Sequence, residues 1–125
     1  MSSTPDYKGN AQASLGYIAD YEENYDLSMV HFSKALATSG FNTRTHAQVH
    51  LAKVLLQLGE FNPAESQLKE ALQNDPTNAL GRYLLGIAIQ SQGRANEAIV
   101  EYQTLVKASN GYEGHAAVQL ASLQM

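Results

Sequence analysis

The stretch of sequence that decides the fold is THAQVHLAKVLLQLGEFNPAESQLKEALQNDPTN, residues 45–78. The apolar side chains of its first half recur three or four residues apart, which is the spacing of one face of an α-helix. These residues are Val49, Ala52, Leu55 and Leu56. Gly59 then interrupts the pattern, a second amphipathic segment follows, and Asp75-Pro76 ends it. The stretch therefore predicts two antiparallel helices joined by a tight turn.

The pattern of this stretch recurs on either side of it. A Leu followed by a small residue occurs at intervals of 36 and 34 residues, as Leu15-Gly16, Leu51-Ala52 and Leu85-Gly86. Each Leu is followed, seventeen residues later, by a bulky side chain: Phe32, Leu68 and Tyr102. Self-similarity at this period is typical of solenoids, in which stacked helix pairs bury a continuous core. We therefore predict an all-α fold of three helix pairs and a seventh helical segment.

The element boundaries follow from the periodicity and its breaks. Residues 1–9 have no apolar period, and we predict a flexible tail there. Residues 10–125 are predicted to form a single domain, with repeats at about 9–42, 45–78 and 79–112 and a terminal helix at 113–125. Leu15, Ile18 and Ala19 are predicted to form the apolar face of the first helix, and Gly40 to stop the second.

Two positions in each unit are predicted to form the turn between the paired helices and the start of the second helix. Glu23 occupies the turn position that glycine holds in the other two units. One shared position, just before the second helix of each unit, is predicted to be an N-cap because Asx side chains accept a hydrogen bond from an unpaired backbone N–H. These residues are Asp26, Asn62 and Asn96.

Composition excludes several classes of function. The formal net charge of −4 gives no positive surface for a phosphate backbone, so we expect no nucleic-acid partner. The chain has no cysteine, which excludes disulfides and thiolate metal sites. It also has no run of about 18 apolar residues and no apolar segment after Met1. We predict a soluble protein, cytoplasmic by default, with the periplasm left open.

The residues of the middle unit carry a resemblance to a known family. Residues 45–78 resemble a tetratricopeptide repeat, whose pattern they match in order at Leu51, Ala52, Leu55, Gly59, Phe61, Ala64, Leu68, Ala71 and Pro76. The third unit departs from the pattern at Ala95 and Leu105, and the first at Glu23 and Ser28. The resemblance implies a right-handed superhelical solenoid of antiparallel helix pairs, about seven helices in all.

The resemblance also implies a function. In this family the first helix of each pair lines a concave groove that binds extended or helical peptides. The chain is thus expected to be a non-enzymatic protein-interaction module or scaffold, with assembly factor and chaperone-like adaptor among its roles. Carried over position by position, the groove-facing residues form one stripe. They are Asn10, Tyr17, Asp20, Tyr21, His46, His50, Lys53, Gln57, Tyr83, Ile87 and Gln90.

One specificity of the family is expected to be missing. Members that hold the free C-terminal carboxylate of chaperones place a Lys and an Asn on the first helix, with further Lys and Arg on the third unit. The corresponding positions in this sequence hold Ala13, Tyr17, Leu80 and Leu84. The resemblance therefore implies that this carboxylate clamp is absent, and we do not expect binding of a chaperone tail.

No reacting or cofactor-binding constellation is evident in the sequence. His46 and His50 have the i, i+4 spacing that can chelate a metal, but no third ligand accompanies them. The acidic residues between Asp20 and Asp26 span a helix corner, where carboxylates are solvated. We therefore expect no metal, no cofactor and no enzymatic activity.

The C-terminal segment leaves a second function open. Residues 114–125 are apolar on more than one side, which is unusual for a terminal cap. The segment is either the first helix of a further repeat or a helix that meets a partner, such as a second copy of the chain. The alternative function is then a structural protein that self-assembles through this helix. The candidate residues are Val118, Leu120, Ala121, Leu123 and Met125.

Overall fold

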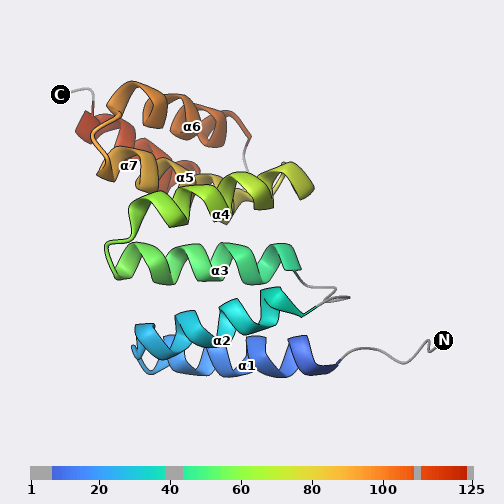
Figure 1. The fold of residues 1–125 in the computed structure, drawn as a ribbon. Coiled ribbons are helices and arrows are strands. Elements are labelled where there is room, and N and C mark those ends of the chain that lie inside the picture. Colours follow the sequence, from blue (N-terminus) through green and yellow to red (C-terminus); the bar gives the residue numbers. More distant parts are fainter. Residues whose placement is uncertain (1–6, 39–43, 109–110, 124–125) are drawn as a thin grey trace.

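A computed structural model describes residues 7–38, 44–108 and 111–123, and within them the chain forms seven α-helices and no strand. The helices are α1 (Tyr7–Tyr21), α2 (Tyr25–Ala37), α3 (Arg44–Gln57), α4 (Phe61–Asn74), α5 (Ala79–Ser91), α6 (Ala95–Ala108) and α7 (Glu113–Leu123). Figure 1 shows them stacked from α1 and α2 at one end to α6 and α7 at the other. Each helix packs on the next, which confirms the predicted all-α solenoid. None of these helices is both long and apolar enough to cross a membrane.

Close contact inside each pair depends on a small residue facing a large one. A Cβ added at Gly16 would lie 3.0 Å from the Phe32 ring, and one added at Gly86 would lie 2.5 Å from the Tyr102 ring. Both rings are completely buried. In the first and third pairs the small residue of the Leu-small repeat therefore marks a point where the paired helices approach too closely for a larger side chain.

The turns confirm one prediction and correct another. Glu23 lies at the predicted turn position, and its φ of 61°, close to the 78° of Gly59, is in the left-handed region. The N-caps of α2 and α4, however, are Asn24 and Glu60, two residues earlier than predicted. The Asn24 side chain accepts a hydrogen bond from the Leu27 N–H at 3.3 Å, because Asn24 directly follows the left-handed Glu23 and α2 begins at the next residue, Tyr25. The residues predicted as caps instead lie in the first helical turns: Asp26, Asn62 and Asn96.

The ends of two helices differ slightly from the predicted boundaries. Helix α1 begins at Tyr7 and includes Gly9, which was placed in the flexible tail. Helix α2 ends at Ala37, and Gly40 lies outside the described residues. The second pair spans residues 44–74 and the third spans residues 79–108.

The apolar face of α1 is buried less than predicted. Ala19 is 2% exposed, whereas Leu15 is 44% and Ile18 is 55% exposed. The residues at the position of Leu15 in the next two units, Leu51 and Leu85, are each 5% exposed. The difference arises because α2 packs on α3 and α4 packs on α5, while no described helix precedes α1.

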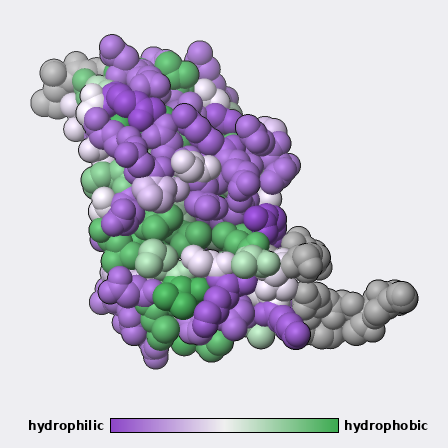
Figure 2. All heavy atoms as spheres, viewed as in Figure 1, coloured by the Kyte–Doolittle hydropathy of each residue, from purple (hydrophilic) through white to green (hydrophobic). Residues whose placement is uncertain are grey.

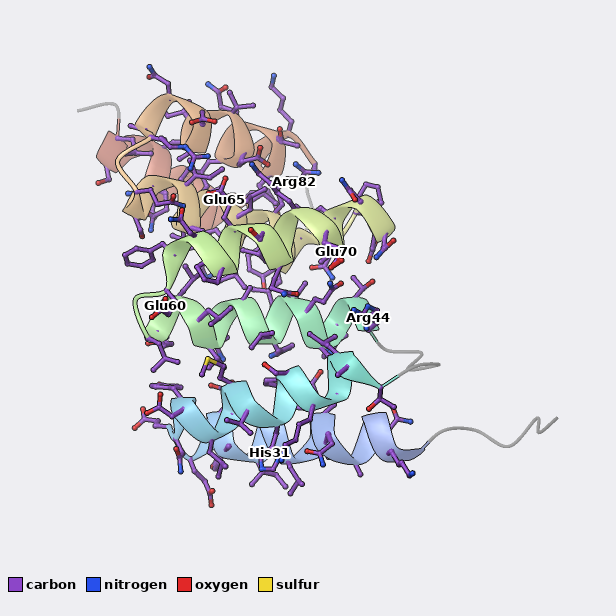
Figure 3. The ribbon with its side chains drawn as sticks, in the orientation of Figure 1. His31, Arg44, Glu60, Glu65, Glu70 and Arg82 are labelled. Atoms are coloured by element: carbon purple, nitrogen blue, oxygen red, sulfur yellow. The ribbon has the colours of Figure 1, made fainter. Side chains whose placement is uncertain are left out.

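The buried carboxylate of Glu65 links the second helix pair to the third through hydrogen bonds. Glu65 on α4 is 7% exposed and accepts two hydrogen bonds from Arg94, at 2.9 and 2.7 Å. Gln92 and Lys69 also contact its carboxylate, at 2.8 and 2.9 Å, and Figure 3 shows Glu65 between α4 and the helices beyond it. These donors, Arg94 foremost, lower the pKa of Glu65 to about 2.

Replacing Glu65 by Gln is expected to lower the free energy of unfolding at pH 7 by about 2 kcal/mol. The loss stays below that of a fully buried pair because Arg94, with a side chain 35% exposed, can return to water. The pKa of Glu65 is lowered from 4.5, so the wild type loses this stabilisation as the pH falls from 4.5 towards 2. Urea denaturation at pH 7 and pH 3 measures both effects.

Glu97→Gln is the matched control, because Glu97 pairs with the same Arg94 but its side chain is 60% exposed. It should change stability far less than Glu65→Gln. An equal loss in the two variants, or an unchanged acid dependence in Glu65→Gln, would contradict the assignment.

Candidate functional site

The predicted groove residues all lie on the first helices of the three pairs, α1, α3 and α5. These helices also contact one another along the stack, α1 with α3 and α3 with α5. We call the surface defined by these eleven residues the α1–α3–α5 face. It is defined by Asn10, Tyr17, Asp20, Tyr21, His46, His50, Lys53, Gln57, Tyr83, Ile87 and Gln90.

An aromatic and imidazole cluster joins α1 to α3 on this face. The Tyr17 hydroxyl lies 2.6 Å from Nδ1 of His46, and its ring meets the His50 ring edge-on at 4.9 Å between centroids. The two imidazoles are 4.7 Å apart, and the buried Phe32 ring supports Tyr17 from beneath at 4.9 Å. The sequence placed these three polar side chains on the same face, and the structure brings them into contact.

Burial keeps the central imidazole of this cluster neutral. The pKa of His50 is lowered to about 4, mainly by desolvation and secondly by the nearby His46 and Lys53. Its Nδ1 atom is buried and has no hydrogen-bond partner. Burial also raises the pKa of the Tyr17 hydroxyl. At neutral pH the His50 ring is therefore uncharged.

His50 is expected to make the fold weaken in mild acid. Its pKa is lowered from 6.5 to about 4, so protonation favours the unfolded chain as the pH falls between these values. We expect about 1 kcal/mol less stability at pH 5 than at pH 7, a figure reduced for the partial exposure of the ring. In His50→Gln this difference should disappear, as measured by urea denaturation at the two pH values. The same slope in both proteins would disprove it.

A salt bridge makes a second connection between α1 and α3. Lys53 Nζ lies 3.1 Å from Asp20 Oδ2, and the side chains are 42% and 12% exposed. Lys53 and Asp20 are both predicted groove residues, so the charge of Lys53 is balanced within the predicted site.

The α5 part of the face is tied to α6 and α7. The Tyr83 ring lies 5.7 Å from both Tyr112 and His115 and 6.1 Å from Tyr102. The Tyr102 hydroxyl donates to Gln90 Oε1 at 2.7 Å. Tyr112 and His115 therefore extend the aromatic surface beyond α5, and the sequence analysis did not assign them to the site.

Helix α7 follows the packing pattern of a fourth first helix. Ala116 is completely buried, and Leu120 and Leu123 pack against the core. A signal in the sequence marks this relation: Leu120-Ala121 follows Leu85-Gly86 by 35 residues, which continues the Leu-small repeat. His115 then takes the position that His46 has on α3.

The predicted self-assembly residues do not share one surface. Leu120 and Leu123 face the core, whereas Val118 is 67% exposed and Ala121 is also exposed. Met125 lies outside the described residues. The segment was predicted to be apolar on more than one side, and the described candidates accordingly divide between a packed face and an open one.

The remaining predicted groove residues differ in how exposed they are. Tyr21 is 90% exposed and Gln57 is exposed, while Asn10 and Ile87 are partly buried. Ile87 packs against the core with part of its side chain. Among the described residues, no three His, Asp or Glu side chains gather as a metal site would require.

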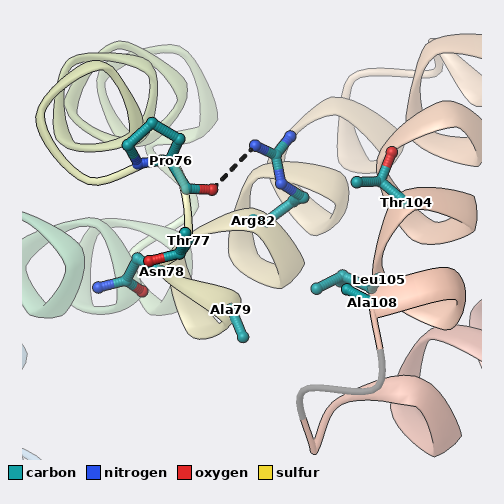
Figure 4. Close-up of a pocket in the computed structure, with 8 residues that line it drawn as sticks. All are labelled: Pro76, Thr77, Asn78, Ala79, Arg82, Thr104, Leu105 and Ala108. Carbon is teal, nitrogen blue, oxygen red and sulfur yellow. Dashed lines mark hydrogen bonds between the residues drawn. The ribbon is translucent and has the colours of Figure 1, made fainter.

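A separate pocket of about 300 Å³ lies between α5 and α6, and Figure 4 shows the residues that line it. Its guanidinium, Arg82, is held 2.7 Å from Glu101 Oε1 and donates to the Pro76 carbonyl at 3.3 Å. Its lining is Pro76, Thr77, Asn78, Ala79, Arg82, Thr104, Leu105 and Ala108. Because Arg82 is already paired with Glu101, we do not assign a ligand site to this pocket.

The fold and the site together define a class of protein. The chain is a stack of helix hairpins whose first helices together form one face. This is the architecture of an α-solenoid interaction domain. Residues 45–78 match the family model described as tetratricopeptide repeat. The chain therefore contains a tetratricopeptide repeat at residues 45–78 and has the fold of tetratricopeptide-repeat domains.

Known proteins of this fold are similar over most of the chain. A curated relative is the tetratricopeptide repeat and J domain-containing co-chaperone DNJ1 of Fusarium oxysporum f. sp. lycopersici, 35% identical over 83 residues, which are 66% of this chain. The matched part is 15% of that relative's length. The Arabidopsis OM64 TPR domain superposes with a TM-score of 0.83 at 20% identity, covering 94% of each chain. The Sgt2 TPR domain from Aspergillus fumigatus gives 0.83 at 19%, covering 98% of this chain and 81% of its own.

Proposed function

We propose that the chain is a protein-interaction module that holds an uncharged, partly apolar segment of a partner protein on the α1–α3–α5 face, with no catalytic step of its own. The observation that carries this proposal is the chemistry of the face. It combines exposed or half-buried rings with neutral donors and acceptors, and its Lys53 charge is balanced by Asp20. Aromatic side chains beside amide groups favour binding of a peptide through its backbone and apolar side chains.

Two solved structures of this fold support a peptide as the ligand. The first TPR of Spaghetti (RPAP3), with a TM-score of 0.85 at 18% identity, covers 98% of this chain and 96% of its own and is bound to the HSP90 peptide SRMEEVD. The second TPR domain of human RPAP3 is in complex with the HSP70 peptide SGPTIEEVD. Both peptides are acidic and end in Asp, and they serve here as models of the binding mode.

The face of this chain is unsuited to such acidic tails. The positions at which clamp-bearing relatives carry cations hold Ala13, Leu80 and Leu84, of which Ala13 is 4% and Leu84 is 8% exposed. His50, with a pKa of about 4, adds no positive charge at neutral pH. We infer that the natural ligand is a less charged segment than a chaperone tail.

The experiment selects the ligand without assuming its identity. Twelve-residue peptides displayed on phage are selected on the chain, and the tightest one is measured by fluorescence polarisation, with labelled SRMEEVD measured in parallel. We expect an aromatic or aliphatic peptide to bind saturably and SRMEEVD to show no saturation up to about 1 mM.

Ile87→Glu is the test variant, and Val100→Glu on α6 is its control because Val100 is 57% exposed and lies off the face. The selected peptide should lose about tenfold or more in affinity for Ile87→Glu and be unaffected by Val100→Glu. Equal affinity for the two variants would refute the face as the binding site. Tight binding of SRMEEVD would refute the inferred class of ligand.

A further inference from the structure

A pocket of about 400 Å³ lies at the edge of the stack, where α2 meets the turn between α3 and α4. Its lining combines side chains of the first helix pair with side chains of the second. None of the lining residues belongs to the α1–α3–α5 face, so the binding face proposed above does not use this pocket. We call it the edge pocket, and it is lined by Asp26, Met29, Leu55, Leu58, Glu60 and Pro63.

The inner part of the edge pocket is apolar. Leu55 is 7% exposed, and Met29 and Leu58 are partly buried and pack against the core. Figure 2 shows hydrophobic residues gathered over α3 and α2, while the view over α4 to α6 is mostly hydrophilic. The flexible side chain of a methionine adapts to groups of different shape, so this lining suits an apolar group of a partner.

Two carboxylates without a partner lie at the rim of the edge pocket. Asp26 lies in the first turn of α2, and Glu60 directly precedes α4, as Figure 3 shows. Both side chains are exposed, and that of Glu60 makes no capping hydrogen bond although it holds the N-cap position. Among the described residues, the ion pairs of the chain involve neither of them. The rim therefore offers two negative charges to a cation.

Between the second and third helix pairs, the corresponding position contains an arginine of the chain itself. The Arg94 guanidinium lies 2.7 Å from Glu65 Oε2 and 2.6 Å from Glu97 Oε2. Gln92 also donates a hydrogen bond to Glu65, at 2.8 Å. In the order Glu65, Gln92, Arg94 and Glu97, the repeat period gives their counterparts in the edge pocket as Met29, Leu58, Glu60 and Pro63.

The edge pocket differs from this network because it lacks the cation. Arg94 balances two carboxylates, whereas Glu60 adds a negative charge at the same position of the preceding junction. A guanidinium can pair with two carboxylates at once, because it is planar and has five N–H donors. Its methylene groups also pack on apolar surface. The component that would complete the edge pocket is therefore an arginine side chain beside apolar groups.

We propose that the edge pocket binds a segment of another protein in which an arginine is flanked by aliphatic residues. The guanidinium pairs with Asp26 and Glu60, and an aliphatic neighbour packs on Met29 and Leu58. The charges of the rim and of the segment are complementary, and the net charge of −4 favours the approach of a basic segment. The edge pocket is a docking site in addition to the α1–α3–α5 face.

The first experiment selects peptides for the edge pocket. Short peptides with one fixed arginine, displayed on phage, are selected on the wild-type chain after removal of all phage that bind Glu60→Arg. This variant supplies an arginine at the position that Arg94 has in the next junction. The tightest peptide is then measured by fluorescence polarisation, beside a copy in which uncharged citrulline replaces the arginine.

We expect saturable binding that citrulline weakens at least about tenfold. Binding should also weaken as the salt concentration rises from about 20 to 300 mM, because the rim carboxylates are exposed. If no peptide survives the selection, or if the citrulline copy binds equally well, the proposal is overturned.

The second experiment changes the rim while circular dichroism checks the fold. Asp26→Asn/Glu60→Gln should weaken the selected peptide at least about fivefold, and Glu60→Arg at least about tenfold. Glu97→Gln is the matched control, because it removes a carboxylate with 60% side-chain exposure from the corresponding edge of the next junction. It should leave the affinity unchanged. Equal affinities of the rim variants and the control would contradict the proposed site.

The edge pocket and the α1–α3–α5 face are tested separately. The peptide selected for the face should bind Glu60→Arg within about twofold of its wild-type affinity, so failure of this proposal is distinguishable from failure of the proposed function. Sedimentation equilibrium of the chain alone, up to about 1 mM, should show no association that Glu60→Arg abolishes. Such an association would assign the edge pocket to a second copy of the chain and overturn the proposed partner.

Discussion

Replacing Tyr102 by Ala is expected to lower the free energy of unfolding by about 4 kcal/mol. Tyr102 is completely buried, and its ring fills the space against Gly86, where an added Cβ would lie only 2.5 Å away. The surrounding helices can close such a cavity only in part, so the lost contacts and the cavity both contribute. Urea denaturation followed by circular dichroism measures the change.

Tyr102→Phe separates the ring from its hydroxyl. This variant retains the packing and loses the hydrogen bond to Gln90, so we expect a cost of about 1 kcal/mol. If Tyr102→Phe destabilised the chain as much as Tyr102→Ala, the hydrogen bond rather than the packed ring would hold α5 and α6 together, contrary to the account given above.

Replacing Phe32 by Ala is expected to lower the free energy of unfolding by a similar amount, about 4 kcal/mol. Phe32 is completely buried, and it packs against Gly16 and, edge-on at 4.9 Å, against Tyr17. Its loss should also loosen the cluster on the α1–α3–α5 face. Water entering beside His50, whose ring centroid is 6.4 Å from that of Phe32, should raise the pKa of His50 from about 4 towards its ordinary 6.5.

Titration of the His50 ring by NMR reads out this second effect, and Phe32→Leu is the control that keeps most of the buried volume. A His50 pKa that is unchanged in Phe32→Ala would show that burial by this ring is not what keeps the imidazole neutral.

The sequence was sufficient to predict the helix pairs. Each helix shows in the local spacing of its apolar residues, and the repeat shows in the recurring small residues Gly16, Ala52 and Gly86. The sequence was insufficient for the exposure of α1. Leu15 has the same position as Leu51, and the pattern therefore predicts the same burial, but α3 packs on a preceding helix, α2, and no described helix precedes α1. The N-caps were placed two residues late because the left-handed turn residue sets the start of each second helix.

The candidate site was predictable in position and less so in chemistry. Helical spacing places Tyr17, His46 and His50 on one face, and the structure brings them together. The pairing of Lys53 with Asp20 joins residues on different helices, and periodicity contains no information on which charges meet. Tyr112 and His115 were missed, although the Leu120-Ala121 continuation of the repeat indicates that α7 behaves as another first helix.

The central claim is that α1, α3 and α5 together form the peptide-binding face. It is tested most directly by NMR, with the phage-selected peptide titrated into uniformly ¹⁵N-labelled chain. The account predicts that the largest amide shifts occur at His50, Lys53 and Ile87 and that α2, α4 and α6 change little. Shifts concentrated on the second helices, or on the pocket beside Arg82, would contradict it.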